Sequence, residues 1–165
     1  MNQNTQAQRK GKVIEVLNKA RARELMAISQ YMNQHFNLGD MDYGELASNV
    51  KQIAIDEMRH SEIFAERIKE LDGEPTTEPA SKAEKGQKVQ SIFSFDAKLE
   101  DDTIGVYNQF VTVCRENGDS TSMKIFEKII DEEQVHFNYF DKVNEHIEKL
   151  GDVYLAQIAG TQSEK

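Results

Sequence analysis

Apolar residues recur at spacings of three and four over four long stretches of the chain, the pattern of helices that bury one side. The helices expected from this pattern and from the turn residues between them are listed by range: Gln8 to Asn37, Met41 to Leu71, Asp96 to Asn117, Ser120 to Leu150 and a short one, Asp152 to Ala159. Asp96 is expected as the N-cap of the third helix, and Gly151 ends the fourth. Residues 160–165 are expected as a polar tail.

The pattern breaks between Asp72 and Phe95, where two prolines and two glycines occur. A connection of this length inside a compact domain is uncommon and requires a reason. A helix of ~30 residues is ~45 Å long, and ~24 extended residues reach ~80 Å, enough to return along a whole bundle. The sequence therefore predicts an all-α single domain over residues 1–165, with a four-helix bundle over about 8–150, a long crossover between the second and third helices, and a short fifth helix over about 152–159.

Each of the four long helices carries one glutamate within its apolar seam: Glu24, Glu57, Glu100 and Glu133. The second and fourth helices add His60 and His136 three residues after their glutamates, and residues three apart share a helix face. A carboxylate in a core costs several kcal/mol unless it is paired, hydrogen-bonded or bound to metal. These six residues are therefore candidates for a buried polar site.

The two halves of the chain form a pseudo-repeat. A shift of 76 positions relates six matched pairs: Glu24 and Glu100, Tyr31 and Tyr107, Ile53 and Ile129, Glu57 and Glu133, His60 and His136, Phe64 and Phe140. This offset predicts two helical hairpins that meet with near two-fold symmetry.

Four carboxylates and two imidazoles match the ligand needs of two divalent cations, because carboxylates can bridge two ions and each imidazole supplies one terminal nitrogen. The alternative is a set of buried ion pairs. The seams contain no lysine or arginine to neutralise four glutamates apart from a marginal Arg67, which favours the dimetal interpretation.

Composition narrows the class further. The 165 residues are 38% hydrophobic and 30% charged, typical of a globular protein, and the formal charge of −9 disfavours nucleic acid as a partner. The single cysteine, Cys114, allows no internal disulfide and fits a reducing compartment. No apolar run has the ~20 residues that a membrane span needs, and the polar N-terminus is unlike a signal peptide, so a cytoplasmic protein is expected.

The motifs resemble those of the ferritin-like di-iron carboxylate proteins and, among them, closely those of the bacterioferritins over nearly the whole chain. The motifs that carry the resemblance are Arg23-Glu24-Leu25-Met26-Ala27-Ile28 with Gln30-Tyr31, Ile55-Asp56-Glu57-Met58-Arg59-His60, Glu100, and Asp131-Glu132-Glu133-Gln134-Val135-His136. The resemblance implies a ferroxidase that oxidises iron(II) with dioxygen or peroxide and stores iron(III) mineral in a cage of 24 subunits. It implies that Glu57 and Glu133 bridge two irons, that Glu24 and Glu100 are terminal ligands, and that His60 and His136 each bind one iron.

Met58 follows Glu57 by one position, which turns its side chain about 100° away from the metal seam. On the residues alone it is a gap-filler at a subunit contact. The resemblance implies instead that Met58 from each of two subunits ligates one haem or related iron porphyrin on a dimer axis, through which an electron-donor protein would act. A second apolar stripe of Leu25, Ile28 and Met32, with Ile55 and Met58, predicts the dimer face.

Two positions leave functional alternatives open. Bacterioferritins often carry a histidine five residues before the second-helix bridging glutamate, beside an aspartate; here the pair is Gln52 and Asp56, which puts inner-surface iron handling in doubt. Tyr31 is either an electron donor near Glu24 or a packed tyrosine with one hydrogen bond. At the level of function, the alternatives are a di-iron oxidase or peroxide reductase that stores little iron, and a non-enzymatic helical scaffold.

Overall fold

The structure is a computed structural model that describes residues 3–162, and within that range it is built from helices. Their bounds are α1 (Gln3–Asp40), α2 (Gly44–Glu70), α3 (Val89–Glu116), α4 (Ser120–Leu150) and α5 (Asp152–Ile158). The predicted all-α class and bundle are confirmed. The last three residues of the predicted polar tail, and the first two residues of the predicted domain, lie outside the described range.

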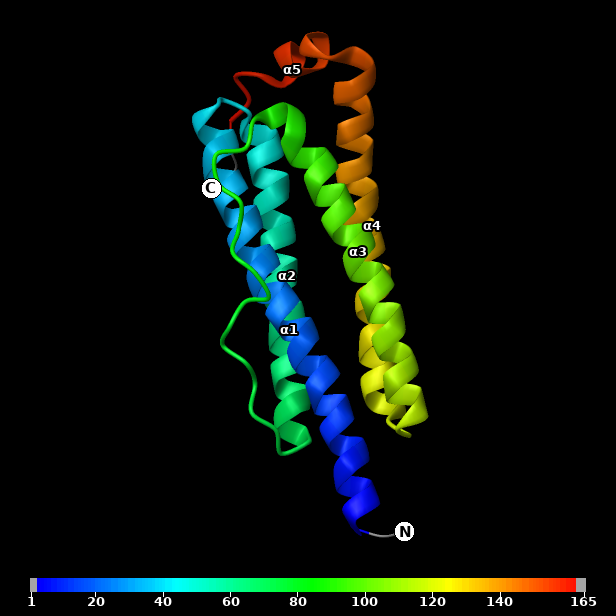
Figure 1. Cartoon of the computed structure of the whole chain (residues 1–165). Coiled ribbons are helices and arrows are strands. Elements are labelled where there is room, and N and C mark those ends of the chain that lie inside the picture. Colours follow the sequence, from blue (N-terminus) through cyan, green and yellow to red (C-terminus); the bar gives the residue numbers. More distant parts are fainter. Residues whose placement is uncertain (1–2, 163–165) are drawn as a thin grey trace.

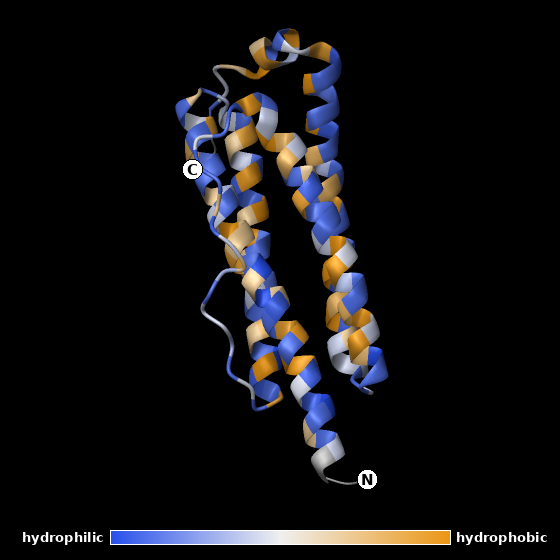
Figure 2. Cartoon of the chain, in the orientation of Figure 1, coloured by the Kyte–Doolittle hydropathy of each residue, from blue (hydrophilic) through white to orange (hydrophobic). Residues whose placement is uncertain are grey.

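The bundle consists of two antiparallel hairpins, α1 with α2 and α3 with α4 (Figure 1). The crossover runs back along the first hairpin, and α5 lies across one end of the bundle. Apolar and polar residues alternate along every long helix (Figure 2), as expected of helices that bury one side each.

The core consists of two apolar clusters. One includes Tyr31, Phe93 and Phe140, and the other includes Phe64 and Phe126. Along each long helix the predicted seam glutamate falls between the residues of one cluster and those of the other. The packing of both clusters therefore fixes the four glutamates at the same level of the bundle.

The predicted start of the third helix at Asp96 is wrong, because α3 begins seven residues earlier at Val89. Val89, Ile92 and Phe93 are buried at helical spacing, so this turn packs into the core and continues the helix. Asp96 is not an N-cap; its side chain is fully buried and accepts a hydrogen bond from Gln34. The remaining helix ends differ from the predicted ones by a few residues, and α4 has its predicted bounds.

Side chains of α1 hold the crossover, residues 71–88, against the first hairpin. Asn18 donates to the carbonyl of Glu74, Arg21 donates to the carbonyl of Thr76, and Gln30 both donates to and accepts from the backbone of Glu84. A segment without helix or strand thus has several of its backbone groups hydrogen-bonded to side chains of α1.

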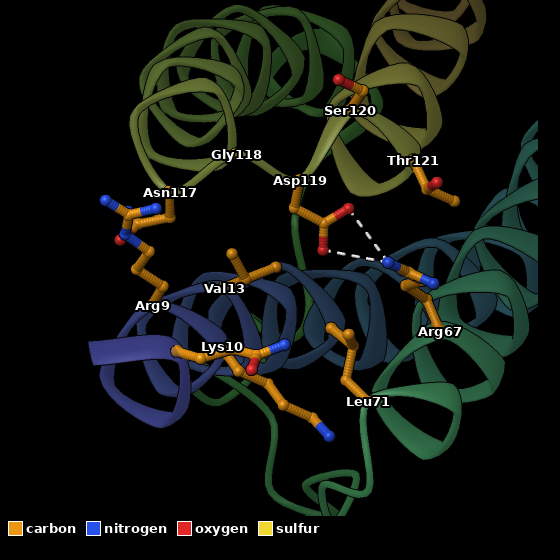
Figure 3. Close-up of a pocket in the computed structure, with 11 residues that line it drawn as sticks. Arg9, Lys10, Val13, Arg67, Leu71, Asn117, Gly118, Asp119, Ser120 and Thr121 are labelled. Atoms are coloured by element: carbon orange, nitrogen blue, oxygen red, sulfur yellow. Dashed lines mark hydrogen bonds and ion pairs between the residues drawn. The ribbon is translucent and has the colours of Figure 1, made fainter. Parts of the chain in front are cut away.

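A hollow of about 680 Å³ lies at the other end of the bundle, where α1, the end of α2 and the α3–α4 turn meet (Figure 3). Arg67 points into it and donates from Nη2 to both carboxylate oxygens of Asp119 at 3.0 Å. Asp119 in turn caps α4 by accepting from the Ser122 amide at 2.8 Å. Arg67, the marginal seam cation, is therefore engaged here with Asp119 and Glu70.

Among residues 3–162, no helix has the length and apolar character required to cross a membrane.

Candidate metal centre

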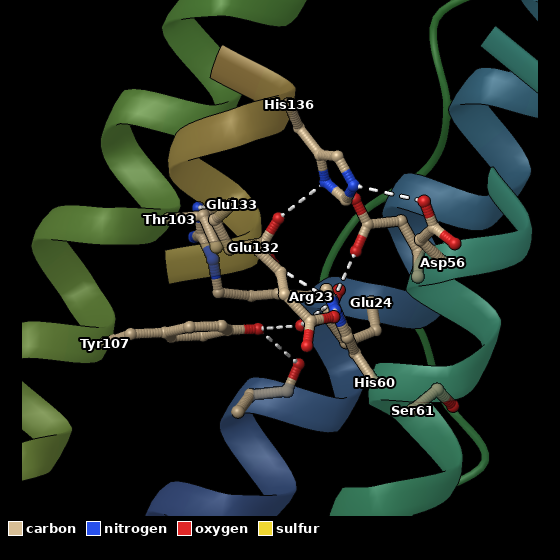
Figure 4. A network of polar contacts seen from close by, with 12 residues as sticks. Arg23, Glu24, Asp56, His60, Ser61, Thr103, Tyr107, Glu132, Glu133 and His136 are labelled. Atoms are coloured by element: carbon tan, nitrogen blue, oxygen red, sulfur yellow. Dashed lines mark hydrogen bonds and ion pairs between the residues drawn. The ribbon is translucent and has the colours of Figure 1, made fainter. Parts of the chain in front are cut away.

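The structure brings all six predicted site residues together in the middle of the bundle. Figure 4 labels four of them, Glu24, His60, Glu133 and His136. Each of the six side chains is at most 5% exposed. Residues on four helices meet here because the two hairpins pack with the seams facing one another.

Possible ligand atoms form two groups, each with all atoms within 4.8 Å of one another. The first group contains Glu24, Glu57, His60 and Glu133, and the second contains Glu57, Glu100, Glu133 and His136. Glu57 and Glu133 belong to both groups, whereas each of the other four residues belongs to one. Two carboxylates shared between two sets of ligands are the arrangement that two neighbouring cations require.

The imidazoles face the shared carboxylates through Nδ1. His60 Nδ1 lies 2.9 Å from Glu57 Oε2 and 3.3 Å from Glu133 Oε1. His136 Nδ1 lies 3.0 Å from Glu133 Oε2 and 3.0 Å from Glu57 Oε1. Nδ1 of each ring is therefore the atom available to a metal ion, and each Nε2 points outward.

Two buried tyrosines hold the outer carboxylates. The Tyr107 hydroxyl donates to Glu24 and the Tyr31 hydroxyl donates to Glu100, in both cases through short hydrogen bonds. Tyr31 was expected near Glu24, but the structure places its hydroxyl on the glutamate of the other hairpin. Each tyrosine therefore fixes a carboxylate across the hairpin interface.

Two further acidic residues, which the sequence analysis missed, contact the outward nitrogens of the imidazoles. Glu132 Oε2 lies 2.8 Å from His60 Nε2, and Asp56 Oδ2 lies 3.5 Å from His136 Nε2. A carboxylate on the far nitrogen fixes the orientation of a metal-binding imidazole and raises its basicity. The sequence contained a signal for these contacts, because Asp56 and Glu132 are a further acidic pair separated by 76 positions.

Charges inside the cluster are strongly coupled. Burial lowers the pKa of His60, but hydrogen bonds to Glu133 and Glu57 outweigh it and raise the pKa to about 12. The same balance raises the pKa of His136 to about 10. Burial raises the pKa of Glu57, but hydrogen bonds from His136 and His60 lower it to about 2. Without metal, the imidazolium rings thus stabilise the negative charge of Glu57.

The outer carboxyl groups differ from the inner ones. Burial and the charges of Glu133 and Glu57 raise the pKa of Glu24 and that of Glu100 well above the usual range for a glutamate. His60 Nδ1 lies 4.0 Å from Glu24 Oε1, and among the described residues no lysine or arginine makes an ion pair with either outer group. A proton or a metal ion can supply the positive charge that these groups lack.

The donor set fits divalent iron. Oε1 of Glu57 and Oε1 of Glu133 are buried and accept no well-aligned hydrogen bond; each faces an imidazole Nδ1, at 3.0 Å and 3.3 Å, and an ion bound between these atoms would satisfy both. Carboxylate and imidazole are ligands that suit iron. The cluster is therefore built for cations rather than for a purely structural ion-pair network.

Comparisons with known proteins agree with this geometry. Residues 14–150 match the family model described as a ferritin-like domain. A bacterioferritin of Desulfovibrio desulfuricans is 63% identical over 155 residues, which cover 94% of this chain and 87% of the relative. Bacterioferritin BfrA of Mycobacterium tuberculosis is 34% identical over 146 residues, covering 88% and 92%. The chain belongs to the bacterioferritin family.

Solved structures support the same relationship. An X-ray structure of the Desulfovibrio desulfuricans bacterioferritin, described as showing its diiron site in different catalytic states, superposes with a TM-score of 0.95 at 61% identity, covering 96% of this chain and 93% of that one. Mycobacterium tuberculosis BfrA gives a TM-score of 0.84 at 33% identity, covering 89% and 93%. Membership of the bacterioferritins and the carboxylate–histidine cluster together support a di-iron site and a role in iron storage.

Met58 lies on the outside of this bacterioferritin subunit and is 53% exposed. It lines a surface hollow of about 490 Å³ together with Ile55, Arg59 and Ala65. Leu25, Ile28 and Ile55, the predicted neighbours on the second apolar stripe, are all incompletely buried within the chain. The structure thus leaves this stripe partly exposed on the chain.

Gln52 and Asp56 lie beside a smaller hollow of about 190 Å³ that reaches His136. Asp56 Oδ1 accepts from Gln52 Nε2 at 3.3 Å and from Arg59 Nη1 at 2.9 Å. Gln52 therefore acts as a hydrogen-bond donor to the aspartate.

Proposed function

We propose that this chain is a ferroxidase and iron-storage subunit that oxidises iron(II) at the centre formed by Glu24, Glu57, His60, Glu100, Glu133 and His136. The observation that carries the proposal is the pair of four-residue groups that share Glu57 and Glu133. Two iron(II) ions would bind with these two carboxylates between them. Dioxygen or peroxide would accept the electrons.

The residues around the ligands would prepare the site for this reaction. The tyrosine hydroxyls on Glu24 and Glu100 hold both outer carboxylates in place before metal arrives. Glu132 and Asp56 hold the outward nitrogens of the imidazoles, which leaves Nδ1 of each ring directed at the ions. Tyr31 is also buried and close enough to Glu100 to serve as a nearby electron donor.

The test replaces each shared carboxylate. Glu57→Ala or Glu133→Ala removes a ligand from both ions at once and leaves their mutual repulsion less screened, so rapid oxidation of added iron(II) should be abolished. Glu66→Ala, which removes an exposed carboxylate from the same helix α2, is the matched control and should oxidise iron(II) at the wild-type rate. Unchanged rates in both Glu57→Ala and Glu133→Ala would overturn the assignment.

Iron content after growth with ample iron tests storage separately from oxidation. A storage protein would hold many iron ions for each chain, whereas an oxidase or peroxide reductase would hold about two, the capacity of one dinuclear site. A retained content of two ions would replace the storage proposal with an oxidase.

Met58 would bind an iron porphyrin, such as haem, on a two-fold axis between two subunits. Its thioether is exposed and lines a hollow with the apolar Ile55 and Ala65, and the polar side chains of the same hollow, Arg21, Arg59, Ser61 and Glu62, could contact the charged edge of a planar porphyrin at a dimer interface. Two thioether ligands would stabilise iron(II) in the porphyrin. This would favour the passage of electrons from a donor protein to the stored iron, which is released on reduction. Met58→Leu should assemble normally but lack the visible absorption of the porphyrin; a full complement with an unchanged spectrum would show that Met58 is not the ligand.

The same face would form an isologous dimer, and dimers would build a cytoplasmic shell of 24 subunits. The exposed Leu150 and Val153, 51% and 65% exposed, place a second apolar surface at the α4–α5 end, where α5 would meet its copies at another axis. Light scattering should therefore give a mass many times that of the 18.9 kDa chain. A stable monomer at micromolar concentration would refute this assembly.

A further inference from the structure

A second buried polar contact joins α1 to α3 one turn away from the contact of Tyr31 with Glu100. Gln34, three residues after Tyr31, donates from Nε2 to Asp96 Oδ1 at 2.8 Å. The same nitrogen donates to Gln87 Oε1 of the crossover at 2.9 Å. Asp96 is 0% exposed and Gln34 is 1% exposed, so water does not compete for this contact.

Two oxygens of this contact have no hydrogen-bond partner, Asp96 Oδ2 and Gln34 Oε1. If Asp96 were ionised, both atoms would be acceptors only, and neither could satisfy the other. Within residues 3–162, no lysine, arginine or histidine forms an ion pair with Asp96. The titratable groups around it are Tyr31 on α1, Glu100 on α3 and Tyr139 on α4, none of which supplies a positive charge.

We propose that Asp96 is held as a neutral carboxylic acid and is a positioning residue that sets α1 against α3 beside the Tyr31–Glu100 contact. A proton on Oδ2 turns this atom from a hydrogen-bond acceptor into a donor. It then no longer requires a hydrogen bond from a neighbouring group, which the surrounding core does not supply. An aspartic acid with its ordinary pKa favours the ionised form over the protonated form by about a thousandfold at pH 7. Burying an unpaired carboxylate opposes folding more strongly than that.

The electrostatics agree with the geometry. Burial raises the pKa of Asp96 well above its usual range, and the hydrogen bond from Gln34 offsets only part of the rise. A negative Asp96 would also raise the pKa of Tyr31 and would add a further negative charge beside the acidic cluster. A neutral acid supplies the α1–α3 contact without that charge.

The role of Asp96 as a positioning residue rests on the proposed metal centre, whereas its protonation state does not. Infrared spectra test the protonation state on zinc-loaded protein, in which the four glutamates are carboxylates and zinc undergoes no redox reaction. At pH 7, the wild-type spectrum minus that of Asp96→Asn should show a C=O stretching band of a protonated carboxyl group that shifts in deuterium oxide. The control, Asp101→Asn, alters an exposed aspartate of α3 and should leave that band in place. Carboxylate bands in the Asp96 difference spectrum would overturn the proposal.

Thermal denaturation gives a second reading of the protonation state. Because the folded pKa is raised, the native state holds a proton that the unfolded chain releases above about pH 4. The melting temperature of the wild type should therefore fall relative to that of Asp96→Asn as pH rises from 5 to 8. A constant difference between the two proteins would contradict a neutral Asp96.

Cobalt(II) binding tests the positioning role. Asn supplies an acceptor and a donor in place of the acid, so Asp96→Asn should bind cobalt(II) within twofold of the wild type. Asp96→Leu has no hydrogen bond to Gln34 and should bind about tenfold more weakly, the usual effect of losing a partner outside the ligands. Wild-type affinity in Asp96→Leu would refute positioning. If Asp96→Leu does not fold, weak cobalt(II) binding by Asp96→Asn would refute the positioning role instead. Absence of cobalt(II) binding by the wild type would refute the metal centre but would leave the infrared result for Asp96 unaffected.

Discussion

Loading the metal-free centre with two divalent ions should release four protons. In the metal-free protein at pH 7, His60 and His136 carry protons, because their pKa values are raised to about 12 and about 10. Burial and neighbouring carboxylates raise the pKa values of Glu24 and Glu100 well above the usual range for a glutamate, and we expect both groups to hold protons as well. Metal ligation requires neutral imidazole and ionised carboxylate, so each of these four groups must lose one proton.

A charge count leads to the same number. Before metal binds, the two imidazolium rings and the two outer carboxyl groups hold these four protons. With two divalent ions, four carboxylates balance four positive charges while both imidazoles are neutral. Four protons for two ions mean two protons for each ion, so the apparent affinity should rise about a hundredfold with each unit of pH near neutrality.

The assay adds zinc(II) to metal-free protein in weakly buffered solution at pH 7 and follows an indicator dye. Zinc is redox-inert, so protons from iron oxidation and hydrolysis do not contribute. Glu66→Ala, altered only at an exposed carboxylate of α2, should release the same four protons. Release of two or fewer for each pair of zinc ions would show that the imidazoles are uncharged, or the outer carboxyl groups ionised, before metal binds.

Further predictions follow from contacts around the ligands. Glu132→Gln should weaken cobalt(II) binding about tenfold, and more than Asp56→Asn, because the Glu132 contact is 2.8 Å and the Asp56 contact is 3.5 Å; an equal effect would contradict this order. Tyr107→Phe removes the donor to Glu24 and should weaken cobalt(II) binding about three- to tenfold, measured by titration beside the wild type. The raised pKa of His60 stabilises the metal-free fold below pH ~6.5 and loses its effect as pH rises through about 12, so metal-free protein should melt at lower temperature in alkali, and zinc loading should reduce that dependence.

Much of the fold could be predicted because its signals are local. Heptad-like apolar seams, the Asn117-Gly118 turn and Gly151 mark helix ends directly, and the bounds of α4 were predicted without error. The start of α3 could not be located because Val89, Ile92 and Phe93 follow a segment rich in proline and glycine, where a short apolar run is ambiguous between loop and helix. Asp96 then satisfied the usual preference for an N-cap, although its actual partner, Gln34, is distant in sequence.

The six candidate ligands were accessible from the sequence because each lies in its own helix seam, and seam positions converge in any four-helix bundle. The residues around them were not, since a side chain next to a seam can face a neighbouring helix, a second subunit or solvent. Asp56 and Met58 flank the same glutamate, yet the first reaches His136 and the second is exposed. Each of the two residues is one position from Glu57 along α2, so their spacing alone does not tell them apart. Only the position of α4, which carries His136, shows that Asp56 makes a contact and Met58 does not.

The contacts that surround the ligands all cross from one hairpin to the other. They are Tyr31 to Glu100, Tyr107 to Glu24, Glu132 to His60, and Asp56 to His136. Neither hairpin alone can therefore orient its own ligands, although each contains half of them. Metal affinity should depend on how firmly the hairpins pack, and a substitution in either apolar cluster that separates them should loosen the outer carboxylates and the imidazoles together. The 76-residue repeat thus yields a centre in which each half completes the other, which explains why the offset extends beyond the ligands to the tyrosines and acids that hold them.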